Sequence, residues 1–599
     1  MLTPVKSLLI FLLLFFTVIN LQSEIRYISK YGSSTVPYTS WETACDSLQK
    51  CFQYCMTNDT VYVDRGVYRE TIYLQNKNIT VIGLDTDECI IDGTGVDGLD
   101  YKSVLCRFKN CLIELNNITF KKKRVNGEIY SYAVFTTDGN CCINNCKIDS
   151  TYSGISINDG GSVNNTILKR VNEGIHLDGY SMTTLYHFNV KNNILFIVPE
   201  ESDSKGIYFH SGTCNIYNNI ISIPVHENND TGIEVEGNDK ISIKNNLVYG
   251  FGNAVIATSY YGSPTDTTFI VNNTFLNSIR SAVVTGNMPK LFIIKNNILA
   301  HNGKGLYSYG NQGKLDYNMF YENHGVLYTN LPAGAHDIVA DPMFVNDVLP
   351  TYGGDYNFRL QMYSPAIDRG DPNILDVDGS RSDLGMFGGP LGEAYSYMNL
   401  APKPVQNLKA VYEQDISRVK LTWKNNTESD LKRYNIYKDI NQNFVIDSTK
   451  RIGTINDTLF YDIMNKGTLK IYYKLTAVDN SDNESECSTE LNVTITENEE
   501  VDITENMEYG LYQNYPNPFN PSTTISYNLK NQGEVRIKLY TITGELISTI
   551  IEGTKNKGYS ETKIDMGGYT SGIYLYRIEV TGAGKIPVFN DLKKMIYLK

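Results

Sequence analysis

The stretch Ile241-Ser242-Ile243-Lys244-Asn245-Asn246-Leu247-Val248-Tyr249 contains the most informative pattern of the sequence. Apolar residues alternate before the Asn-Asn pair, and a short apolar run follows it. The pair recurs at a regular spacing, beginning at residues 116, 144, 164, 192, 218, 245, 272 and 296. The steps between these pairs are 28, 20, 28, 26, 27, 27 and 24 residues. A period of this size predicts stacked repeats rather than a single globular core.

A second repeated mark is a strand start of the Gly-Ile type. Its occurrences are Gly154-Ile155, Gly174-Ile175, Gly206-Ile207 and Gly232-Ile233, with the variants Ala133-Val134, Ala254-Val255, Ala282-Val283 and Gly305-Leu306. A repeat of about 25 residues, with three short strands in it, is too short for a βαβ unit or for a propeller blade. Asn tolerates the left-handed backbone of a sharp bend. The sequence therefore predicts the coils of a β-helix, with Asn side chains stacked from coil to coil.

This repeat resembles that of the right-handed parallel β-helix in pectate-lyase-like proteins, over roughly residues 60–330. The resemblance implies an all-β chain with a right-handed parallel β-helix over residues 24–400. Two small β-sandwich domains are expected to follow it. Such a β-helix occurs in lyases, hydrolases, adhesins and binding modules, so the fold by itself does not determine the function.

Two segments are expected to close the ends of the β-helix. Residues 25–95 resemble the N-terminal cap of bacterial β-helix proteins, and residues 42–56 are predicted to form a short amphipathic helix over the open coil. Residues 341–390, rich in Pro and Gly, resemble a closing segment at the opposite end. Asp376, Asp378 and Asp383 in this segment are candidate Ca²⁺ ligands. The alternative is that these carboxylates cap turns and pair with Arg381, and the absence of further ligands of the EF-hand type favours it.

The beginning of the chain has the pattern of a secretory signal peptide over residues 1–23. Lys6 precedes an apolar run at residues 8–19, and Ser23 is a small residue suited to cleavage. The run is too short to span a bilayer, and the rest of the sequence contains no apolar segment of spanning length. We therefore expect export through the Sec pathway and no transmembrane anchor in the mature chain.

Charge and cysteine content narrow the function further. The net charge of −13 over 599 residues argues against nucleic-acid binding. It also argues against direct attraction to an acidic polysaccharide unless a cation bridges the two. Ten of the 11 cysteines lie between Cys45 and Cys214. Pairing in an exported chain and burial inside the coils are both open for them.

The C-terminal third is expected to hold the two sandwich domains. Residues 401–404 form a Pro-containing linker. Residues 405–496 resemble a fibronectin type III domain with Trp423 in its core. Residues 497–508 are an acidic linker. Residues 509–599, with their motif from Leu511 to Pro521, resemble the type A sorting domain of the type IX secretion system.

The resemblance of the C-terminal segment implies a route out of the cell. The type IX secretion machinery is the implied partner, and the chain is expected to cross the outer membrane of a Gram-negative bacterium. In that family the sorting domain is usually removed. The remaining protein is then either attached to the cell surface or released.

The Gly-Ile strands place chemically active side chains in two outward columns. Side chains alternate along a strand, and neighbouring coils lie about 4.8 Å apart. The first column is predicted to read Ser156, His176, Tyr208, Glu234 and Ile256, and the second Asn158, Asp178, His210, Glu236 and Thr258. Three neighbouring coils thus gather groups suited to acid-base chemistry on a sugar. The candidate catalytic residues are His176, Asp178, Tyr208, His210 and Lys240.

Glu234-Val235-Glu236 is similar to a strand of the chondroitinase-B and alginate-lyase family. There, two outward glutamates hold Ca²⁺ and a nearby lysine is the base, so the resemblance makes Glu234 and Glu236 candidate metal ligands and Lys240 the candidate base. Such a Ca²⁺ would neutralise a uronate carboxylate. The family's partner arginine is missing, because Ile256 and Thr258 occupy the outward positions of the next coil.

The motifs favour a uronate lyase over a glycoside hydrolase if the protein is an enzyme. The paired Asp motifs and the Gly-His-Gly motif of polygalacturonases are absent from the sequence. The sequence thus predicts a secreted β-helix protein that binds extracellular polysaccharide, with cleavage as an open question. The alternative is a non-catalytic surface adhesin or structural protein.

Overall fold

The computed structural model describes residues 23–599 except 97–103, 123–131, 180–183, 200–202, 225–228, 238, 259–265, 287–290, 311–312, 415–416, 465–468, 496–508, 515–516 and 583–586. The predicted signal peptide, apart from Ser23, and the predicted linker at 497–508 lie outside the described residues. Within the described part of the chain, no helix has the length and apolar character needed to cross a membrane.

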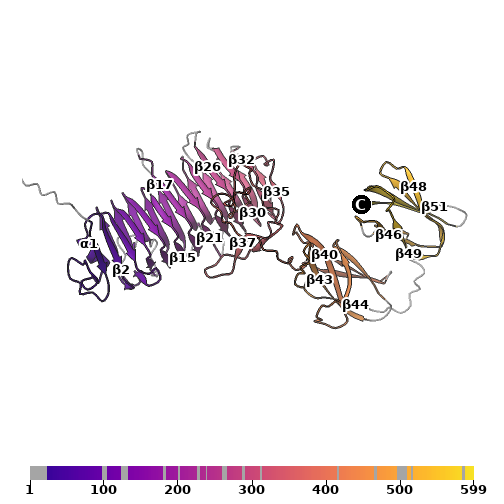
Figure 1. Cartoon of the computed structure of the whole chain (residues 1–599), viewed down its shortest axis with the longest axis horizontal. Coiled ribbons are helices and arrows are strands. Elements are labelled where there is room, and N and C mark those ends of the chain that lie inside the picture. The colour runs from indigo at the N-terminus through magenta and orange to yellow at the C-terminus, as the bar shows by residue number, and fades with distance from the viewer. Residues whose placement is uncertain are drawn as a thin grey trace, which may run out of the picture. The chain divides into compact units, whose positions relative to one another are not determined.

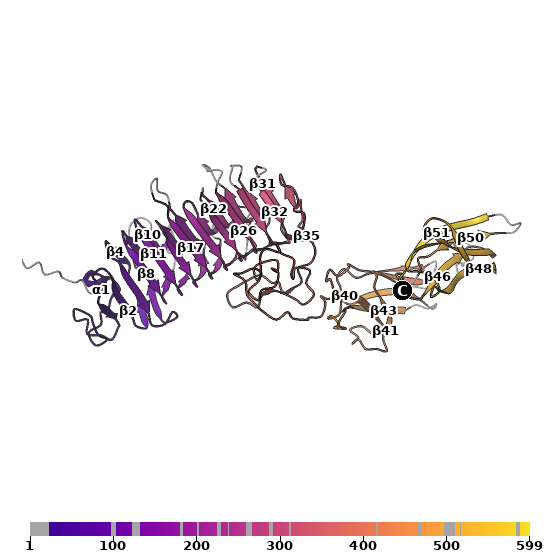
Figure 2. The same ribbon diagram turned by 45° about the horizontal axis from the view of Figure 1, so that its top comes forward.

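Three long parallel sheets wind around a common interior and form a β-helix (Figures 1 and 2). Sheet A contains β1 (Ile25–Ile28), β2 (Asp59–Val63), β5 (Ile79–Gly83), β8 (Leu112–Asn116), β11 (Asn140–Asn144), β14 (Gly161–Asn164), β17 (His187–Lys191), β20 (Thr213–Tyr217), β23 (Ile241–Lys244), β26 (Thr267–Val271), β29 (Leu291–Lys295) and β32 (Gly313–Asp316). Sheet B contains β3 (Gly66–Tyr68), β6 (Cys89–Asp92), β9 (Thr119–Lys121), β12 (Lys147–Asp149), β15 (Ile167–Val171), β18 (Ile194–Ile197), β21 (Ile220–Ser222), β24 (Leu247–Tyr249), β27 (Thr274–Leu276), β30 (Ile298–Ala300), β33 (Met319–Tyr321) and β35 (Ile338–Val339). Sheet C contains β4 (Ile72–Gln75), β7 (Cys106–Lys109), β10 (Tyr132–Thr137), β13 (Ser153–Asn158), β16 (Glu173–Asp178), β19 (Lys205–Phe209), β22 (Thr231–Glu236), β25 (Asn253–Thr258), β28 (Ser281–Thr285), β31 (Lys304–Ser308) and β34 (Tyr328–Thr329). Successive strands visit the three sheets in turn, which confirms the predicted β-helix.

A ladder of buried asparagines runs along one interior corner of the coils. Its members are fully buried: Asn193, Asn219, Asn246, Asn273, Asn297 and Asn318. Each side-chain amide donates to the side-chain oxygen of the next member at 2.9 or 3.0 Å. The ladder satisfies polar groups that would otherwise be buried without partners. It therefore accounts for the recurrence of Asn at this period.

The two asparagines of a pair have different roles, and these roles shift along the chain. From Asn192 onward, the first Asn has a positive φ of 54° to 58° and forms the bend, while the second enters the ladder. In the first three pairs it is the second Asn that forms the bend, with φ between 50° and 58°. The interior position then falls on the following residue. The ladder accordingly begins at Thr166, whose backbone N–H donates to the Asn193 side-chain oxygen at 2.9 Å.

The interior of the coils is otherwise apolar. Ile, Val, Leu and Phe side chains from all three sheets form one continuous buried cluster. The cysteines between Cys45 and Cys214 are buried as well, apart from Cys142. Burial raises the pKa of the Cys146 thiol to about 12. These thiols are therefore small apolar core groups.

The N-terminal cap contains a helix that is shorter than predicted. Helix α1 spans Leu48–Tyr54, and the hydroxyl of its N-cap residue Ser47 accepts from the Lys50 backbone N–H. The Glu70 carboxylate accepts from the Leu48 and Gln49 backbone N–H groups at 2.9 and 3.0 Å. The residues before Ser47 pair with strand β1 instead, because the Ser29 N–H donates to the Cys45 carbonyl at 2.8 Å.

The closing segment, residues 341–390, folds back along the side of the β-helix. Strands β36 (Phe344–Asn346) and β37 (Asn357–Leu360) form an antiparallel pair in it. Their apolar residues pack in one cluster with outward residues of sheet B, which include Leu247, Leu276 and Ile298. The Asn245 side chain donates to the Gly388 carbonyl at 2.6 Å. The segment therefore covers the outer face of sheet B over several coils.

The rest of the chain contains two antiparallel sandwiches, each with its own core. The first consists of β38 (Lys409–Glu413), β39 (Arg418–Thr422) and β42 (Leu459–Ile463), with β41 (Arg451–Ile455), β40 (Leu431–Asp439), β43 (Leu469–Asp479) and β44 (Leu491–Ile495). The second consists of β45 (Gly510–Leu511), β46 (Ser522–Leu529) and β49 (Gly558–Asp565), with β48 (Leu546–Lys555), β47 (Gly533–Thr541), β50 (Gly572–Thr581) and β51 (Pro587–Tyr597). Trp423 is buried in the first core with its ring 5.3 Å from that of Tyr434, as predicted.

Candidate functional site

The outward columns predicted on sheet C exist in the structure. His176 pairs with Tyr208, Tyr208 with Glu234, and Glu234 with Ile256 on successive strands. In the second column Asp178 pairs with Asn158, and Glu236 pairs with Thr258. His210 directly follows β19, and its backbone N–H donates to the Leu177 carbonyl at 3.0 Å. Parallel pairing of strands β16, β19 and β22 therefore places the predicted side chains on one face.

These side chains form a connected polar surface, which we call the polar patch. It consists of Glu173, His176, Asp178, Lys205, Tyr208, His210, Glu234 and Glu236. Tyr208 lies at its centre, with its hydroxyl donating to the Glu236 carboxylate at 3.1 Å. The Tyr208 ring lies edge-on to the His176 ring, with 4.8 Å between centroids. The Lys205 ammonium lies 4.4 Å from the Tyr208 ring centroid.

Each histidine of the polar patch lies beside a carboxylate. His210 Nδ1 is 3.2 Å from Asp178 Oδ1, and His176 Nδ1 is 3.8 Å from Glu173 Oε1. The His210 side chain is 41% exposed. A carboxylate that orients an exposed imidazole is an arrangement used in general acid-base chemistry.

Lys205 and Glu173 are members of the polar patch that the sequence analysis missed. Lys205 Nζ is 3.0 Å from Glu234 Oε2, and both side chains are largely buried. Glu173 pairs with Lys205 on the neighbouring strand. Both residues directly precede a Gly-Ile pair, where two successive buried positions interrupt the in-out alternation and place the preceding side chain on the outer face. The residue before each Gly-Ile pair was therefore the available sequence signal.

Burial and neighbouring charges shift several pKa values in the polar patch. Burial raises the pKa of the Tyr208 hydroxyl and the adjacent Glu236 carboxylate raises it further, so Tyr208 stays a proton donor at neutral pH. Burial also raises the pKa of the Glu234 carboxyl, and Lys205 offsets only part of this effect. For Glu173, burial raises the pKa, but the neighbouring His176 and the hydrogen bond from the Ser153 hydroxyl outweigh this effect and the net shift is downward.

Lys240, the predicted base, lies next to a different sheet. It precedes β23 of sheet A, and its ammonium lies 5.8 Å from the ring centroid of Phe269 in β26. The ammonium that pairs with Glu234 belongs to Lys205. Ile256 and Thr258 occupy the next coil as the sequence indicated, so no arginine stands at those two positions.

The three aspartates of the closing segment accept hydrogen bonds from nearby backbone and hydroxyl groups. Asp376 accepts from the Asp383 backbone N–H at 3.0 Å and also from that of Gly389. Asp378 accepts from the Ser380 backbone and hydroxyl at 2.9 and 2.6 Å. Asp383 accepts from the Asp368 backbone N–H at 2.9 Å and the Tyr397 hydroxyl at 2.8 Å. Arg381 donates to the Gly370 carbonyl at 2.6 Å.

Ca²⁺ binding stays a prediction for both proposed places. Among the residues that the structure describes, no group of three or more His, Cys, Asp or Glu side chains is arranged to hold a metal ion. In the polar patch, the Glu234 carboxylate is paired with Lys205 and that of Glu236 accepts from Tyr208. These contacts satisfy the carboxylates from within the protein.

The second sandwich domain matches a protein family. Residues 513–586 match the model of the secretion system C-terminal sorting domain. The matched region contains the strands from β46 to β50. In this domain the buried Tyr576 hydroxyl donates to the Tyr512 carbonyl and accepts from the Asn514 N–H, both at 2.7 Å. These bonds attach Tyr512 and Asn514, at the start of the predicted sorting motif, to the sandwich.

Comparison with solved structures gives several distant likenesses. Pectate lyase Pel9A is 15% identical and aligns with 61% of this chain and 96% of its own, at a TM-score of 0.39. A fibronectin-III-like protein from Clostridium thermocellum is 25% identical over 17% of this chain and 99% of its own, at a TM-score of 0.14. The latent PorU dimer from Porphyromonas gingivalis is 16% identical over 33% of this chain and 20% of its own, at a TM-score of 0.18.

No curated protein matches the chain. The β-helix is established by the three parallel sheets themselves. The residues from β46 to β50 fold as an antiparallel sandwich and match the family model over most of that length. Residues 513–586 are therefore a secretion system C-terminal sorting domain, which this chain carries after its parallel β-helix.

Proposed function

We propose that this exported protein binds an extracellular polysaccharide along the polar patch of sheet C. The observation that carries the proposal is the register of His176, Tyr208 and Glu234 on three neighbouring strands. The sorting domain supports export to the cell surface or the medium. A ligand for such a protein is accordingly outside the cell.

The polar patch offers the contacts that sugars use. Carboxylates accept hydrogen bonds from sugar hydroxyls, while imidazole, ammonium and phenol groups donate to sugar oxygens. The Tyr208 ring adds an amphipathic surface. Neighbouring coils lie about 4.8 Å apart, so a linear chain of sugars lying along the β-helix would meet a polar side chain on each of the three coils that carry His176, Tyr208 and Glu234.

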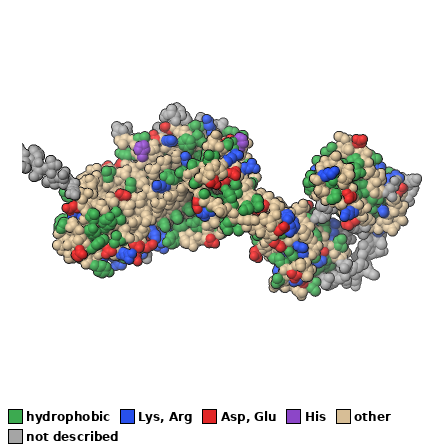
Figure 3. Space-filling view, in the orientation of Figure 1, with side chains coloured by type: hydrophobic (Ala, Val, Ile, Leu, Met, Phe, Trp, Pro, Cys, Tyr) green, Lys and Arg blue, Asp and Glu red, His purple; other side chains and the backbone are tan. Residues whose placement is uncertain are grey.

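Charge favours a neutral polysaccharide over a uronate polymer. The patch contains four carboxylates, Glu173, Asp178, Glu234 and Glu236, against the one ammonium of Lys205. With neutral imidazoles, this leaves three net negative charges on one face, which repel an anionic ligand. A uronate polymer would require a bridging cation. The face shown in Figure 3 carries acidic and basic side chains interspersed, unlike the concentrated basic face of nucleic-acid-binding proteins.

Cleavage is a second candidate function, favoured by the pairing of His210 with Asp178. Asp178 can orient the His210 imidazole as a proton acceptor, with the protonated Tyr208 hydroxyl nearby as a donor. These are the two roles that β-elimination from a uronate requires. A non-catalytic adhesin would use the same surface for binding alone, and product formation separates the two functions.

A binding screen with the full mature chain tests the proposal. The probes are soluble neutral glucan, mannan and xylan, together with polygalacturonate and alginate, each with and without Ca²⁺. We expect a neutral probe to bind, and the combined change Tyr208→Phe and Glu236→Gln to weaken binding at least about tenfold through two lost hydrogen bonds. Asn215→Ala, on the exposed face of sheet A, is the matched control. If both the affinity and the stoichiometry of polymer binding stay at their wild-type values after the double change, the proposal is contradicted.

The same samples test cleavage and the role of Ca²⁺. Absorbance of an unsaturated product reports β-elimination from the two uronate polymers. Loss of product in His210→Ala with unchanged binding would assign a transition-state role to His210. Uronate binding that appears only with Ca²⁺ would support a Ca²⁺ ion that bridges the polar patch and the uronate.

A further inference from the structure

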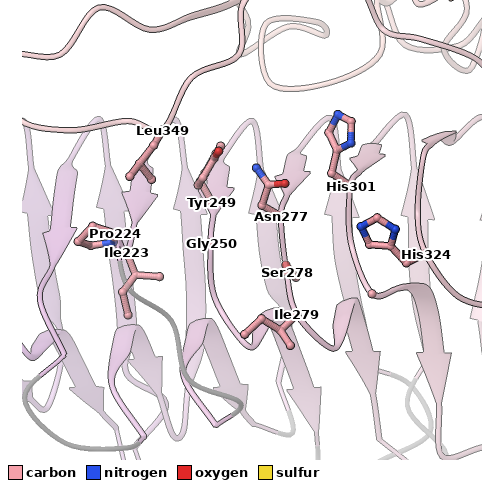
Figure 4. A pocket seen from close by; sticks show the side chains of 11 residues that line it. Ile223, Pro224, Tyr249, Gly250, Asn277, Ser278, Ile279, His301, His324 and Leu349 are labelled. Carbon is pink, nitrogen blue, oxygen red and sulfur yellow. The ribbon is translucent and has the colours of Figure 1, made fainter. Parts of the chain in front are cut away.

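A cleft lies where the coils turn from sheet B towards sheet C. It extends over the ends of strands β21, β24, β27, β30 and β33 and has a volume of about 550 Å³. Its lining includes Tyr249, Asn277, Ile279, His301 and His324 (Figure 4). This volume lies within the range of small-molecule sites. The polar patch shares none of the residues that line the cleft.

One wall of the cleft comes from the closing segment. Leu349 lines the cleft from this segment. The next residue is fixed to sheet B, because the buried Ser222 hydroxyl donates to the Pro350 carbonyl at 2.7 Å. Tyr352 is held further along, with its ring 6.1 Å from that of Phe196 and 4.4 Å from the Lys169 ammonium. The wall is therefore anchored to the coils at two places.

Polar side chains stand in a row along the cleft. Tyr249, Asn277 and His301 come from three neighbouring strands and lie in sequence along one side (Figure 4). Asn277 and His301 directly follow β27 and β30 and have positive φ values of 55° and 57°. Asn277 and His301 therefore occupy equivalent positions on neighbouring coils, about 4.8 Å apart, and Tyr249 comes from the preceding coil, one residue earlier in the register.

His301 has a defined orientation in this row. Its ring lies edge-on to that of Tyr321, with 5.2 Å between centroids. Its Nδ1 lies 3.6 Å from the Glu322 carboxylate. A ligand in the cleft therefore meets an imidazole that is already held in place, which reduces the entropy lost on binding.

The lining defines the chemistry of the ligand. Among the described residues that line the cleft there is no Lys, Arg, Asp or Glu, and the Glu322 carboxylate beside His301 is not part of the lining, so a charged ligand would find no opposite charge among the lining side chains. Ile279, Leu349 and the Tyr249 ring suit the C–H faces of sugar rings. A purely apolar ligand would remove the Asn277 amide and the imidazoles from water without replacing their hydrogen bonds. A neutral ligand with many hydroxyl groups satisfies both parts of the lining.

We propose that this cleft binds a short neutral oligosaccharide, lying across the coils and contacting Tyr249, Asn277 and His301. The cleft is a second site, on the sheet B side of the β-helix, and goes beyond the proposed role of the polar patch. Its ligand lies between the coils and the anchored wall at Leu349. The polar patch, in contrast, lies on the outer face of sheet C.

Isothermal titration calorimetry with the full mature chain tests this site. The probes are the neutral hexasaccharides of β-1,4-linked glucose, mannose and xylose, with hexagalacturonate as the charged comparison. The variants are Asn277→Gly and His301→Gly, because glycine removes the side chain and retains the positive φ of both positions. His187→Ala, an exposed histidine on sheet A, is the matched control. Thermal melting checks that each variant is folded.

We expect at least one neutral hexasaccharide to bind and each glycine variant to weaken that binding about tenfold, the effect of about one lost hydrogen bond to the ligand. His187→Ala should leave the affinity unchanged. The combined Tyr208→Phe and Glu236→Gln variant should retain this binding, which separates the cleft from the polar patch. Absence of binding by all three neutral probes, or binding that both glycine variants retain in full, overturns the proposal.

Discussion

The Asn246 side-chain amide donates to the Asn273 side-chain oxygen at 3.0 Å, from one coil to the next. The same Asn273 oxygen accepts from the Asn246 backbone N–H at 2.9 Å. Asn246 also donates to the Ile216 carbonyl at 3.0 Å. One side chain thus connects three consecutive coils inside the β-helix.

Asn246→Leu should destabilise the β-helix strongly. The change keeps the approximate volume but removes the buried partner of the Asn219 amide and leaves the Ile216 carbonyl without its donor. Each buried polar group left without a partner costs about 1–3 kcal/mol. We therefore expect a loss of several kcal/mol, measured as a lower midpoint of chemical denaturation.

Asn215→Leu provides the matched control for the ladder. Asn215 is an exposed asparagine on the outer face of sheet A, and its side chain donates to the Asn189 oxygen at 3.0 Å. Water can replace that bond, so we expect a change within about 0.5 kcal/mol. Equal midpoints for Asn246→Leu and Asn215→Leu would argue against a structural role for the interior ladder.

Lys205→Met should destabilise the protein by leaving the Glu234 carboxylate without its cation. Only 14% of the Glu234 side chain is exposed, so an unpaired charge there is costly. We expect a loss of about 1–3 kcal/mol at pH 7, seen in denaturation. The double change Lys205→Met and Glu234→Gln should recover part of the loss, because it removes the unpaired charge. If the double variant is as unstable as the sum of both single variants, the two side chains are not coupled.

The stability of the closing segment should depend on the ionisation of Asp383. Burial raises the pKa of its carboxyl to about 6 in the folded protein, against about 3.9 in the unfolded chain. Between these values the folded state binds more protons, so this group's contribution to stability falls as the pH rises from about 4 to 6. Asp383→Asn should remove that fall, which amounts to about 1–3 kcal/mol.

The measurement is the difference in unfolding free energy between wild type and Asp383→Asn across this pH range. Asp378→Asn serves as the control, because hydrogen bonds from Ser380 lower the pKa of the exposed Asp378 carboxyl. The contribution of Asp378 to stability therefore increases, rather than falls, as the pH rises. A wild-type minus Asp383→Asn difference that stays constant from pH 4 to 7 would refute the proposed ionisation.

The fold was predictable from the sequence because the repeated motifs keep their spacing even where the residues between them differ. The Asn-Asn pairs and the Gly-Ile strand starts both keep the coil period, and the observed register follows them. The identity of the buried Asn was not predictable. In the pair at 164–165 the second residue, Asn165, forms the bend, whereas in the pair at 192–193 the first residue, Asn192, forms it. Only the structure shows which residue then points inward.

The candidate site was predictable where side chains alternate regularly along a strand. His176, Tyr208 and Glu234 occupy their expected column for that reason. Lys205 was missed because Gly206 and Ile207 are both buried, which interrupts the in-out alternation along β19. The cleft was missed for a different reason. One of its walls comes from Leu349, more than twenty residues beyond the last lining residue of the coils, and no periodic signal connects the two.

Removal of residues 509–599 should abolish export across the outer membrane and leave the β-helix folded. The family match covers residues 513–586, and the sandwich they form has its own core. The experiment expresses the full and shortened chains in a bacterium with a type IX secretion system and locates each by fractionation. We expect the shortened chain in the periplasm. Its appearance at the cell surface would mean that export does not depend on this domain.

The affinity of the polar patch for polysaccharide is the most direct test of the proposed function. The measurement compares the wild type, Tyr208→Phe with Glu236→Gln, and the Asn215→Ala control on the neutral glucan, mannan and xylan by affinity electrophoresis, with Asn277→Gly and His301→Gly added to all three proteins so that the cleft does not contribute. The proposed function requires retardation of the wild type and the control by at least one polymer, and at least about a tenfold weaker interaction for the double variant. Equal retardation of all three proteins, or of none by any polymer, would contradict it.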